Sequence, residues 1–257
     1  SNLFTRISVS KKAAYKGEVV LVTYKIYSRY GNIALDNYDY AMIDGVWTEE
    51  ITAEKNGWPT KQESINGVRY NIYTLKKEIV FPQKTGEIII PAFDITARVN
   101  RSFFNQGSVI NVKSNTQVLT VKALPTNAPI SFESQVGKDY KFEVSYSTTE
   151  LKTNEAIDLK IKISGKGSLK QLNAPELNFP TDFEVFDPET KNNVKISSSG
   201  LSGSKEFTYL IIPRHHGVFD IDAIEFSYFN TATGKYKTLA SEAVKINVLK
   251  GEGKDLT

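Results

Sequence analysis

The sequence has no cysteine, one methionine and two histidines among its 257 residues. Without cysteine the chain has no disulfide, no thiol nucleophile and no cysteine-ligated metal. It also lacks an apolar run of about 18 residues, which a membrane-spanning helix would need. The 32 basic and 29 acidic residues nearly cancel, so no basic field marks a nucleic-acid partner.

The residues that are present favour strands and packed cores. Hydrophobic residues make up 40% of the chain, and phenylalanine and tyrosine occur 14 and 13 times. The first residues do not form a signal peptide, and Ser1-Asn2-Leu3 is typical of the remnant of a cleaved tag. We therefore expect a soluble fragment of a longer protein, whose native targeting segment and anchor lie outside it.

One pattern occurs twice, in residues 82–93 and 213–224. Each copy reads Pro-x-x-x-Gly-x-apolar-x-Ile-x-Ala-apolar. Proline cannot donate to a strand ladder and glycine permits a turn. Each copy therefore predicts a strand that ends at the proline and another that begins after the glycine. The closing strands, around residues 119–121 and 246–248, recur at a similar spacing, which indicates two units of one architecture.

The strand after each glycine changes its buried face at the same point. Apolar residues before Phe93 in the first copy, and before Ile224 in the second, share one parity, and the later ones take the other. A one-residue bulge has this effect because the side-chain period of a strand is two. We expect such a bulge in both units. Asn66-Gly67 separately predicts a hairpin with a type I′ turn.

The spacing of strands and turns predicts an all-β fold of two tandem immunoglobulin-like β-sandwich domains. About seven strands in roughly 120 residues is typical of such a sandwich. We expect the domains to be residues 1–123 and 139–250. The proline-containing, aperiodic residues 124–138 would be a linker, and the glycine-rich residues 251–257 a frayed tail.

Several short segments occur in the order found in one protein family. They are residues 15–27, 46–49, 139–155, 165–169, 183–188, 207–213 and 226–230. Each is ordinary strand-and-turn sequence, but the ordered combination covers nearly the whole chain. It resembles BatD, the oxygen-tolerance (aerotolerance) protein of Bacteroides and other bacteria. Lys138 departs from the family pattern, which more typically has a Gly-Asp pair at this turn.

The resemblance implies a fragment that lies outside the cytoplasm. Full-length family members have a signal peptide, tandem extracytoplasmic β domains and a transmembrane helix. The chain would then be periplasmic, and the full-length protein would be anchored in the inner membrane. Family members are encoded beside von Willebrand A-domain membrane proteins and a MoxR-type ATPase. This implies partners among other envelope proteins and a role in stress resistance.

The spacing of the residues that could carry chemistry does not match a catalytic or metal-binding motif. His215 and His216 are adjacent, so their side chains point to different sides and do not easily face one metal. Asp220 and Asp222 share a strand face, but no loop of oxygen ligands surrounds them. Residues 200–204 do not match the Gly-x-Ser-x-Gly nucleophile elbow. We expect no catalytic residue, no metal site, no cofactor and no enzymatic activity.

Aromatic residues in the less regular segments are the candidate partner-binding surface. They are Tyr38, Tyr40, Trp47, Trp58, Phe103 and Phe104. Exposed aromatics form hot spots for proteins or platforms for sugars. The alternatives are core or edge packing of at least one tryptophan, and a buried loop anchor at the two phenylalanines.

The sequence and the resemblance together predict a non-enzymatic interaction or scaffold module. It would present loops and exposed edge strands to partner proteins of the envelope. The alternative is a carbohydrate-binding module of an envelope or secreted system, in which Trp47 and Trp58 would hold the sugar.

Overall fold

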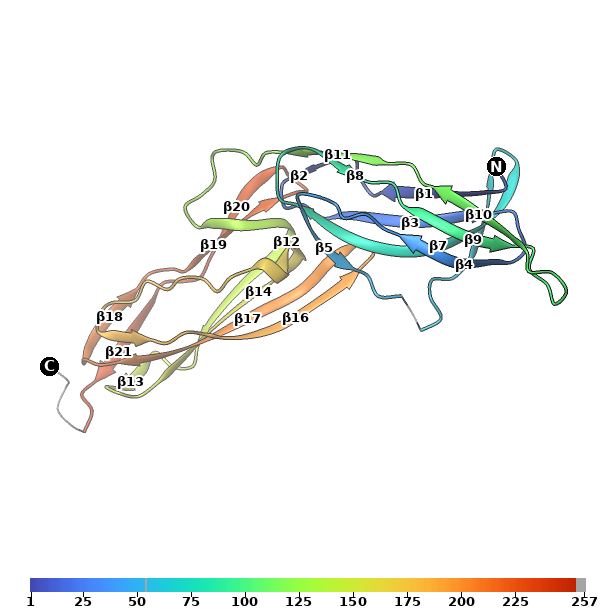
Figure 1. The fold of residues 1–257 in the computed structure, drawn as a ribbon. Helices are drawn as coiled ribbons and strands as arrows, with labels where there is room; N and C mark the ends of the chain where they lie inside the picture. Colours follow the sequence, from blue (N-terminus) through green and yellow to red (C-terminus); the bar gives the residue numbers. More distant parts are fainter. Residues whose placement is uncertain (54, 253–257) are drawn as a thin grey trace. The chain divides into compact units, whose positions relative to one another are not determined.

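The computed structural model describes residues 1–53 and 55–252. Strands dominate this part of the chain, which confirms the predicted all-β class, and the one helix is the short 3₁₀ turn η1, Leu169–Gln171. No helix among the described residues is long and apolar enough to cross a membrane. The chain divides into two compact units, and Figure 1 labels most of their strands. Unit 1 comprises Ser1–Leu124 with Ile196–Gly200, and unit 2 comprises Pro125–Lys195 and the residues from Leu201 onward.

Unit 1 is a sandwich whose strands come from the first half of the chain. The bounds are Leu3–Val9 (β1), Ala13–Tyr15 (β2), Val20–Ser28 (β3), Ile33–Asp39 (β4), Val46–Glu50 (β5), Lys61–Ile65 (β6), Val68–Pro82 (β7), Gly86–Ile90 (β8), Asp94–Val99 (β9), Ser108–Lys113 (β10) and Gln117–Lys122 (β11). β1-β3-β7-β5 form one sheet, with β6 paired to β7, while β10-β9-β4 and β2-β11-β8 form two smaller sheets. Apolar residues of all three sheets, such as Val22, Ile95 and Leu119, meet in one buried core.

Unit 2 repeats this plan with different loops. Its strands are Phe132–Tyr146 (β12), Glu150–Lys152 (β13), Ile157–Gly167 (β14), Phe183–Val185 (β15), Glu189–Ser197 (β16), Gly200–Pro213 (β17), Gly217–Ile221 (β18), Glu225–Asn230 (β19), Lys235–Ala240 (β20) and Val244–Leu249 (β21). A seven-stranded sheet has the order β15-β17-β14-β12-β19-β20, with β16 paired to β17, and a three-stranded sheet has the order β13-β21-β18. Both sheets supply the core, which includes Ile161, Tyr228 and Ile246.

The Pro-x-x-x-Gly pattern marks the same turn in both units. β7 ends at Pro82 and β8 begins at Gly86, while β17 ends at Pro213 and β18 begins at Gly217. The two glycines have φ of 98° and 148°, which residues with a Cβ rarely adopt. The strand boundaries predicted from this repeat are confirmed.

A second turn is tied to each of these prolines. In unit 1 the amide of Gly17 donates a hydrogen bond to the carbonyl of Pro82 at 2.7 Å. In unit 2 the amide of Asn154 donates to the carbonyl of Pro213 at 2.9 Å. Gly17 and Asn154 both have positive φ, at 82° and 65°. The two prolines are 131 positions apart in the chain, and Gly17 and Asn154 are 137 positions apart. The same backbone contact therefore occurs in both units, which supports a single architecture for both.

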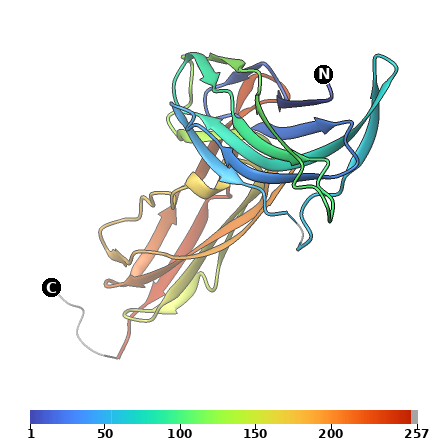
Figure 2. The same cartoon turned by 45° about the vertical axis from the view of Figure 1, so that its right-hand side comes forward.

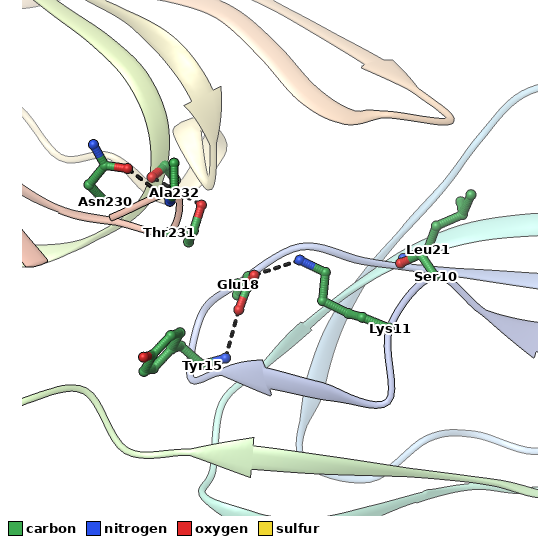
Figure 3. Close-up of polar contacts among 9 residues, drawn as sticks. Ser10, Lys11, Tyr15, Glu18, Leu21, Asn230, Thr231 and Ala232 are labelled. Atoms are coloured by element: carbon green, nitrogen blue, oxygen red, sulfur yellow. Dashed lines mark hydrogen bonds and ion pairs between the residues drawn. The ribbon is translucent and has the colours of Figure 1, made fainter. Parts of the chain in front are cut away.

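A carboxylate closes this second turn in each unit. Glu18 accepts a hydrogen bond from the amide of Tyr15 at 2.8 Å and pairs with Lys11 at 2.6 Å, as Figure 3 shows. Glu155 accepts from the amide of Lys152 at 2.9 Å. The acidic residue that follows the left-handed position therefore has a structural role in both turns.

The bulge predicted after each glycine is wrong. β8 ends at Ile90 and β9 begins at Asp94, and β18 ends at Ile221 and β19 begins at Glu225. At each break the chain exchanges its strand partners, because β8 pairs with β11 but β9 pairs with β10 and β4. In unit 2, β18 pairs with β21 but β19 pairs with β20 and β12. A change of sheet alters the buried parity as a bulge does, and it also raises the number of strands above about seven per unit.

The predicted linker, residues 124–138, extends too far into unit 2. β12 already begins at Phe132, which pairs with Ser227 of β19. The pairing of β12 with β19 shifts register before Val136, so no steady alternation marked this strand in the sequence. Of the predicted tail, residues 253–257 lie outside the described residues.

The Asn66-Gly67 signal forms the hairpin that it predicts. β6 ends at Ile65 and β7 begins at Val68, with φ of 50° at Asn66 and 77° at Gly67, as a type I′ turn requires. Figure 2 shows this hairpin, in cyan, extending beyond the other strands of its sheet.

Candidate partner-binding surfaces

The six predicted aromatic residues all lie in unit 1, but they do not form one patch. Ring contacts join Tyr38 to Tyr40 at 5.6 Å between centroids and Phe103 to Phe104 at 5.1 Å. Among the described residues no ring contact links these pairs to each other or to either tryptophan. The candidate surface therefore divides into separate sites.

Tyr40 is mainly an edge residue of the core, whereas Tyr38 is exposed. The ring of Tyr40 stacks on buried Phe93 at 5.5 Å and meets the edge of buried Tyr24 at 4.9 Å. Burial raises the pKa of the Tyr40 hydroxyl well above its usual value. Tyr38 lies on β4 with more than half of its surface free. Of this pair, only Tyr38 offers a full aromatic face to a partner.

Beneath this pair lies a charged network that the sequence did not reveal. The hydroxyl of Tyr24 donates to Glu78 at 2.7 Å, and Lys76 pairs with the same carboxylate at 3.2 Å. The ammonium of Lys76 also lies 4.9 Å from the centre of the Tyr40 ring. Tyr24 and Glu78 are buried, and desolvation, followed by the hydrogen bond to Glu78, raises the pKa of the Tyr24 hydroxyl far above its usual value.

The network lies where the regular pairing of β3 with β7 ends at a register shift. Tyr24 pairs with Lys76 but Lys25 pairs with Thr74, which leaves Leu75 without an opposite residue. Tyr24 faces Lys76 across the two strands, and Glu78 lies two residues farther along β7. Glu78 lies two residues before buried Val80, so both side chains are on the same face of β7. This spacing is the one signal in the sequence that could have predicted the burial of Glu78.

The two tryptophans lie in different surroundings. Trp47 is on β5, opposite Phe81 of β7, and 50% of its surface is exposed. Trp58 lies between β5 and β6 and is half-buried, with the ammonium of Lys77 4.3 Å from its ring centre. Trp58 also lines a hollow of about 370 Å³ together with Lys25 and Glu63. The packing alternative thus applies to Trp58 in part, and Trp47 is the more accessible of the two.

The two phenylalanines are the most exposed aromatics of the chain's described part. Phe103 is 96% and Phe104 94% exposed, at the tip of the hairpin between β9 and β10. Neither is the buried loop anchor that the sequence left open.

Two edge strands also expose apolar side chains. β8 and β18 each lie at the end of a three-stranded sheet. Ile89 on β8 is 60% exposed and faces Val118 of β11, itself partly exposed. Val218 on β18 is 62% exposed and faces Asn247 of β21. The exposure of Ile89 was predictable from the run Ile88-Ile89-Ile90, because side chains of a strand alternate between its two faces and the middle residue must point outward.

The histidines and aspartates considered for chemistry are exposed on the surface of unit 2. His215 lies 3.2 Å from Asp182, and Asp220 pairs with Lys245 at 3.1 Å in a solvent-exposed position. Among residues 1–53 and 55–252, no group of three or more histidine or acidic side chains is arranged to hold a metal ion.

A comparison with protein-family models gives a match for much of unit 2. Residues 144–248 match the model described as the BatD DUF11-like domain. The match covers 105 of the 257 residues and shows that residues 144–248 are similar to the BatD family. The BatD match runs from β12 to β21 and so includes the second Pro-x-x-x-Gly turn and the exposed edge strand β18.

Comparisons with individual proteins add little to the BatD match. No curated protein matches the sequence. One similar solved structure is FdeC, an Escherichia coli adhesin, with 11% identity over 96% of this chain and a TM-score of 0.21. This chain spans 64% of that structure's length. Another is the type II cohesin dyad from the adaptor ScaA scaffoldin of Acetivibrio cellulolyticus, with 10% identity, coverage of 96% of this chain and 97% of that chain, and a TM-score of 0.21. At these TM-scores neither likeness bears on function.

Proposed function

We propose that this chain is a non-enzymatic interaction module from the periplasmic part of a BatD protein. Its partners would be other envelope proteins, with the von Willebrand A-domain membrane proteins of the same system as the first candidates. The full-length protein would be anchored in the inner membrane and would serve as a scaffold in stress resistance. The observation that carries this proposal is the BatD match over residues 144–248.

The proposed mechanism is addition of a partner segment to an edge strand. An edge strand has a row of unpaired N–H and C=O groups that can accept a strand from another chain. β8 and β18 combine such an edge with an exposed apolar side chain, Ile89 or Val218. Backbone hydrogen bonds would provide affinity, and the exposed side chains would provide selectivity.

Crosslinking in membranes tests this function. The full-length protein would be crosslinked, purified, and its partners identified, with wild type compared to Val218→Lys and Ile89→Lys. Lysine on an edge disfavours added strands. We expect von Willebrand A-domain proteins in the wild-type sample and a severalfold loss with at least one lysine variant. Val218→Thr and Ile89→Thr, which keep a β-branched uncharged side chain, are the controls. Consistent absence of such proteins from the wild-type sample would count against the proposal.

Carbohydrate binding is the second candidate, and the surroundings of Trp58 favour it. The hollow beside this ring is lined by hydroxyl, ammonium and carboxylate groups, including those of Thr23, Lys61 and Glu63. An aromatic face beside such polar groups suits a sugar. A glycan array separates the two functions: binding to a defined sugar that is lost in Trp58→Ala and kept in Trp47→Ala would establish the second candidate at this hollow.

A further inference from the structure

The hairpin between β9 and β10 ends in two unprotected aromatic rings. Phe103 and Phe104 are adjacent in the chain and almost fully exposed, and their rings meet edge to face at an interplanar angle of 83°. Two large apolar side chains at the apex of a hairpin are unfavourable in water. Burial of these two side chains against a lipid surface or a partner protein would therefore be favourable.

The backbone holds this tip in a defined shape. Ser102 and Asn105 form an isolated bridge across the loop, and the side chain of Asn105 accepts a hydrogen bond from the amide of Gly107 at 2.9 Å. Gly107 has φ of 78°, and a Cβ there would lie 2.3 Å from the carbonyl oxygen of Val99. The loop is thus already ordered, and binding through the two rings would not have to fix its backbone conformation.

The charge around the tip is positive. The connecting segments at this end of unit 1 are residues 29–32, 66–67 and 100–107, and they contain Arg29 and Arg101 but no acidic residue. Figure 1 shows the β6–β7 and β9–β10 hairpins at the same end of the unit.

An open hollow of about 570 Å³ lies beside the tip. Arg98, Arg101 and Phe103 are among the residues that line it. Arg98 is already paired with Asp36 at 2.9 Å, whereas Arg101 is exposed. An anionic group beside the hairpin would therefore meet Arg101 first.

We propose that this tip inserts into the surface of an anionic phospholipid bilayer, with Phe103 and Phe104 at the depth of the headgroups and Arg101 against lipid phosphate. A bilayer suits the shape of the tip better than a protein does. The rings are almost fully exposed at a hairpin tip flanked by polar residues, whereas protein hot spots lie near the centre of a well-packed, water-excluding patch. A fluid interface can close around such a projection, and aromatic side chains favour that depth. This contact is independent of the protein partner proposed above.

Vesicle flotation tests the proposal with the whole chain. The probe is vesicles of phosphatidylcholine mixed equally with phosphatidylglycerol, compared with vesicles of phosphatidylcholine alone. We expect binding to the anionic vesicles that weakens with added salt. Phe103→Ser/Phe104→Ser should weaken this binding at least tenfold, because each buried phenylalanine contributes substantially to transfer from water. Arg101→Gln should weaken it by about fivefold.

Matched substitutions elsewhere in unit 1 serve as controls. Met42→Ser removes an exposed apolar side chain away from the tip, and Lys12→Gln removes a cation at the opposite ends of β1 and β3. Both should bind as wild type does. In Phe104→Trp, brominated lipid should quench the new tryptophan, which places the tip within the membrane.

Three results would overturn the proposal. They are no binding of the wild type to anionic vesicles, equal binding by the double serine variant, and no quenching of Phe104→Trp by brominated lipid. Loss of a protein partner by the double variant, with no vesicle binding by the wild type, would instead assign the tip to a protein interface.

Discussion

Removal of one hydroxyl group tests whether the buried network of unit 1 contributes to stability. In Tyr24→Phe the ring and its contacts remain, but the carboxylate of Glu78 loses the donor at 2.7 Å. Glu78 is buried and would keep only its pair with Lys76 at 3.2 Å. A hydrogen bond to a charged group contributes about 1.5–3 kcal/mol. The free energy of unfolding of unit 1 should therefore fall by about 2 kcal/mol.

The fluorescence of tryptophan isolates this effect. The two tryptophans of the chain, Trp47 and Trp58, both belong to unit 1, so their emission reports unfolding of that unit. With a urea dependence of about 2 kcal/mol per M, the midpoint should fall by about 1 M. Tyr38→Phe removes an exposed hydroxyl from the same ring cluster and should leave the midpoint within experimental error of the wild type.

A double-mutant cycle separates the hydrogen bond from general packing. In the Glu78→Gln background the acceptor is neutral, and Tyr24→Phe should then cost only about 1 kcal/mol. If Tyr24→Phe shifts the midpoint no more than Tyr38→Phe does, or costs the same with glutamine as with glutamate, the charged network does not stabilise the unit as the geometry indicates.

Two further predictions concern alkaline pH and one glycine. Burial raises the pKa of Tyr24 above its usual value and that of Tyr209 to about 12, so the folded chain keeps protons that the unfolded chain releases above about pH 10. Stability is therefore complete below pH 10 and falls as pH rises towards 12. In urea titrations read by tryptophan emission, the free energy of unfolding of Tyr24→Phe should fall less steeply with pH than that of the wild type, by up to about 1.4 kcal/mol per pH unit. An unchanged pH dependence would contradict a raised pKa at Tyr24. Gly203→Ala should destabilise unit 2 by about 1–3 kcal/mol through its backbone alone, because φ is 134° and the new Cβ would lie 2.1 Å from the carbonyl oxygen of Asn193. Circular dichroism measures this loss, and Gly31→Ala, which meets nothing within 4 Å, should show almost none.

The elements that the sequence predicted well are those whose local chemistry allows few alternatives. Proline at residues 82 and 213 has no amide to donate, and Asn66-Gly67 can adopt the left-handed conformations of a tight turn, so these strand ends followed from residue type. The parity change before Phe93 was also real. Parity alone does not distinguish a bulge from a change of sheet, because both turn the next side chain to the other face.

The surfaces were harder to predict because exposure depends on tertiary packing. Tyr40 and Tyr38 look alike in the sequence, yet one packs against Phe93 and the other faces solvent. Glu78 was missed because an acid among lysines is usually solvated, and its burial is compensated by the hydroxyl of Tyr24 and the ammonium of Lys76. Phe103 and Phe104 were identified as a pair, but whether the loop turns them inward or outward is decided by its bridge and by Gly107.

The edge of β8 has a consequence for the kind of ligand that it could capture. This strand has only five residues, Gly86–Ile90. Before it, the carbonyl of Pro82 is already engaged by Gly17, and after it Pro91 has no amide hydrogen. A docked segment could thus form backbone hydrogen bonds along only the five residues of β8. Recognition would then rest on a short linear motif, and a synthetic peptide of that length should compete for the site.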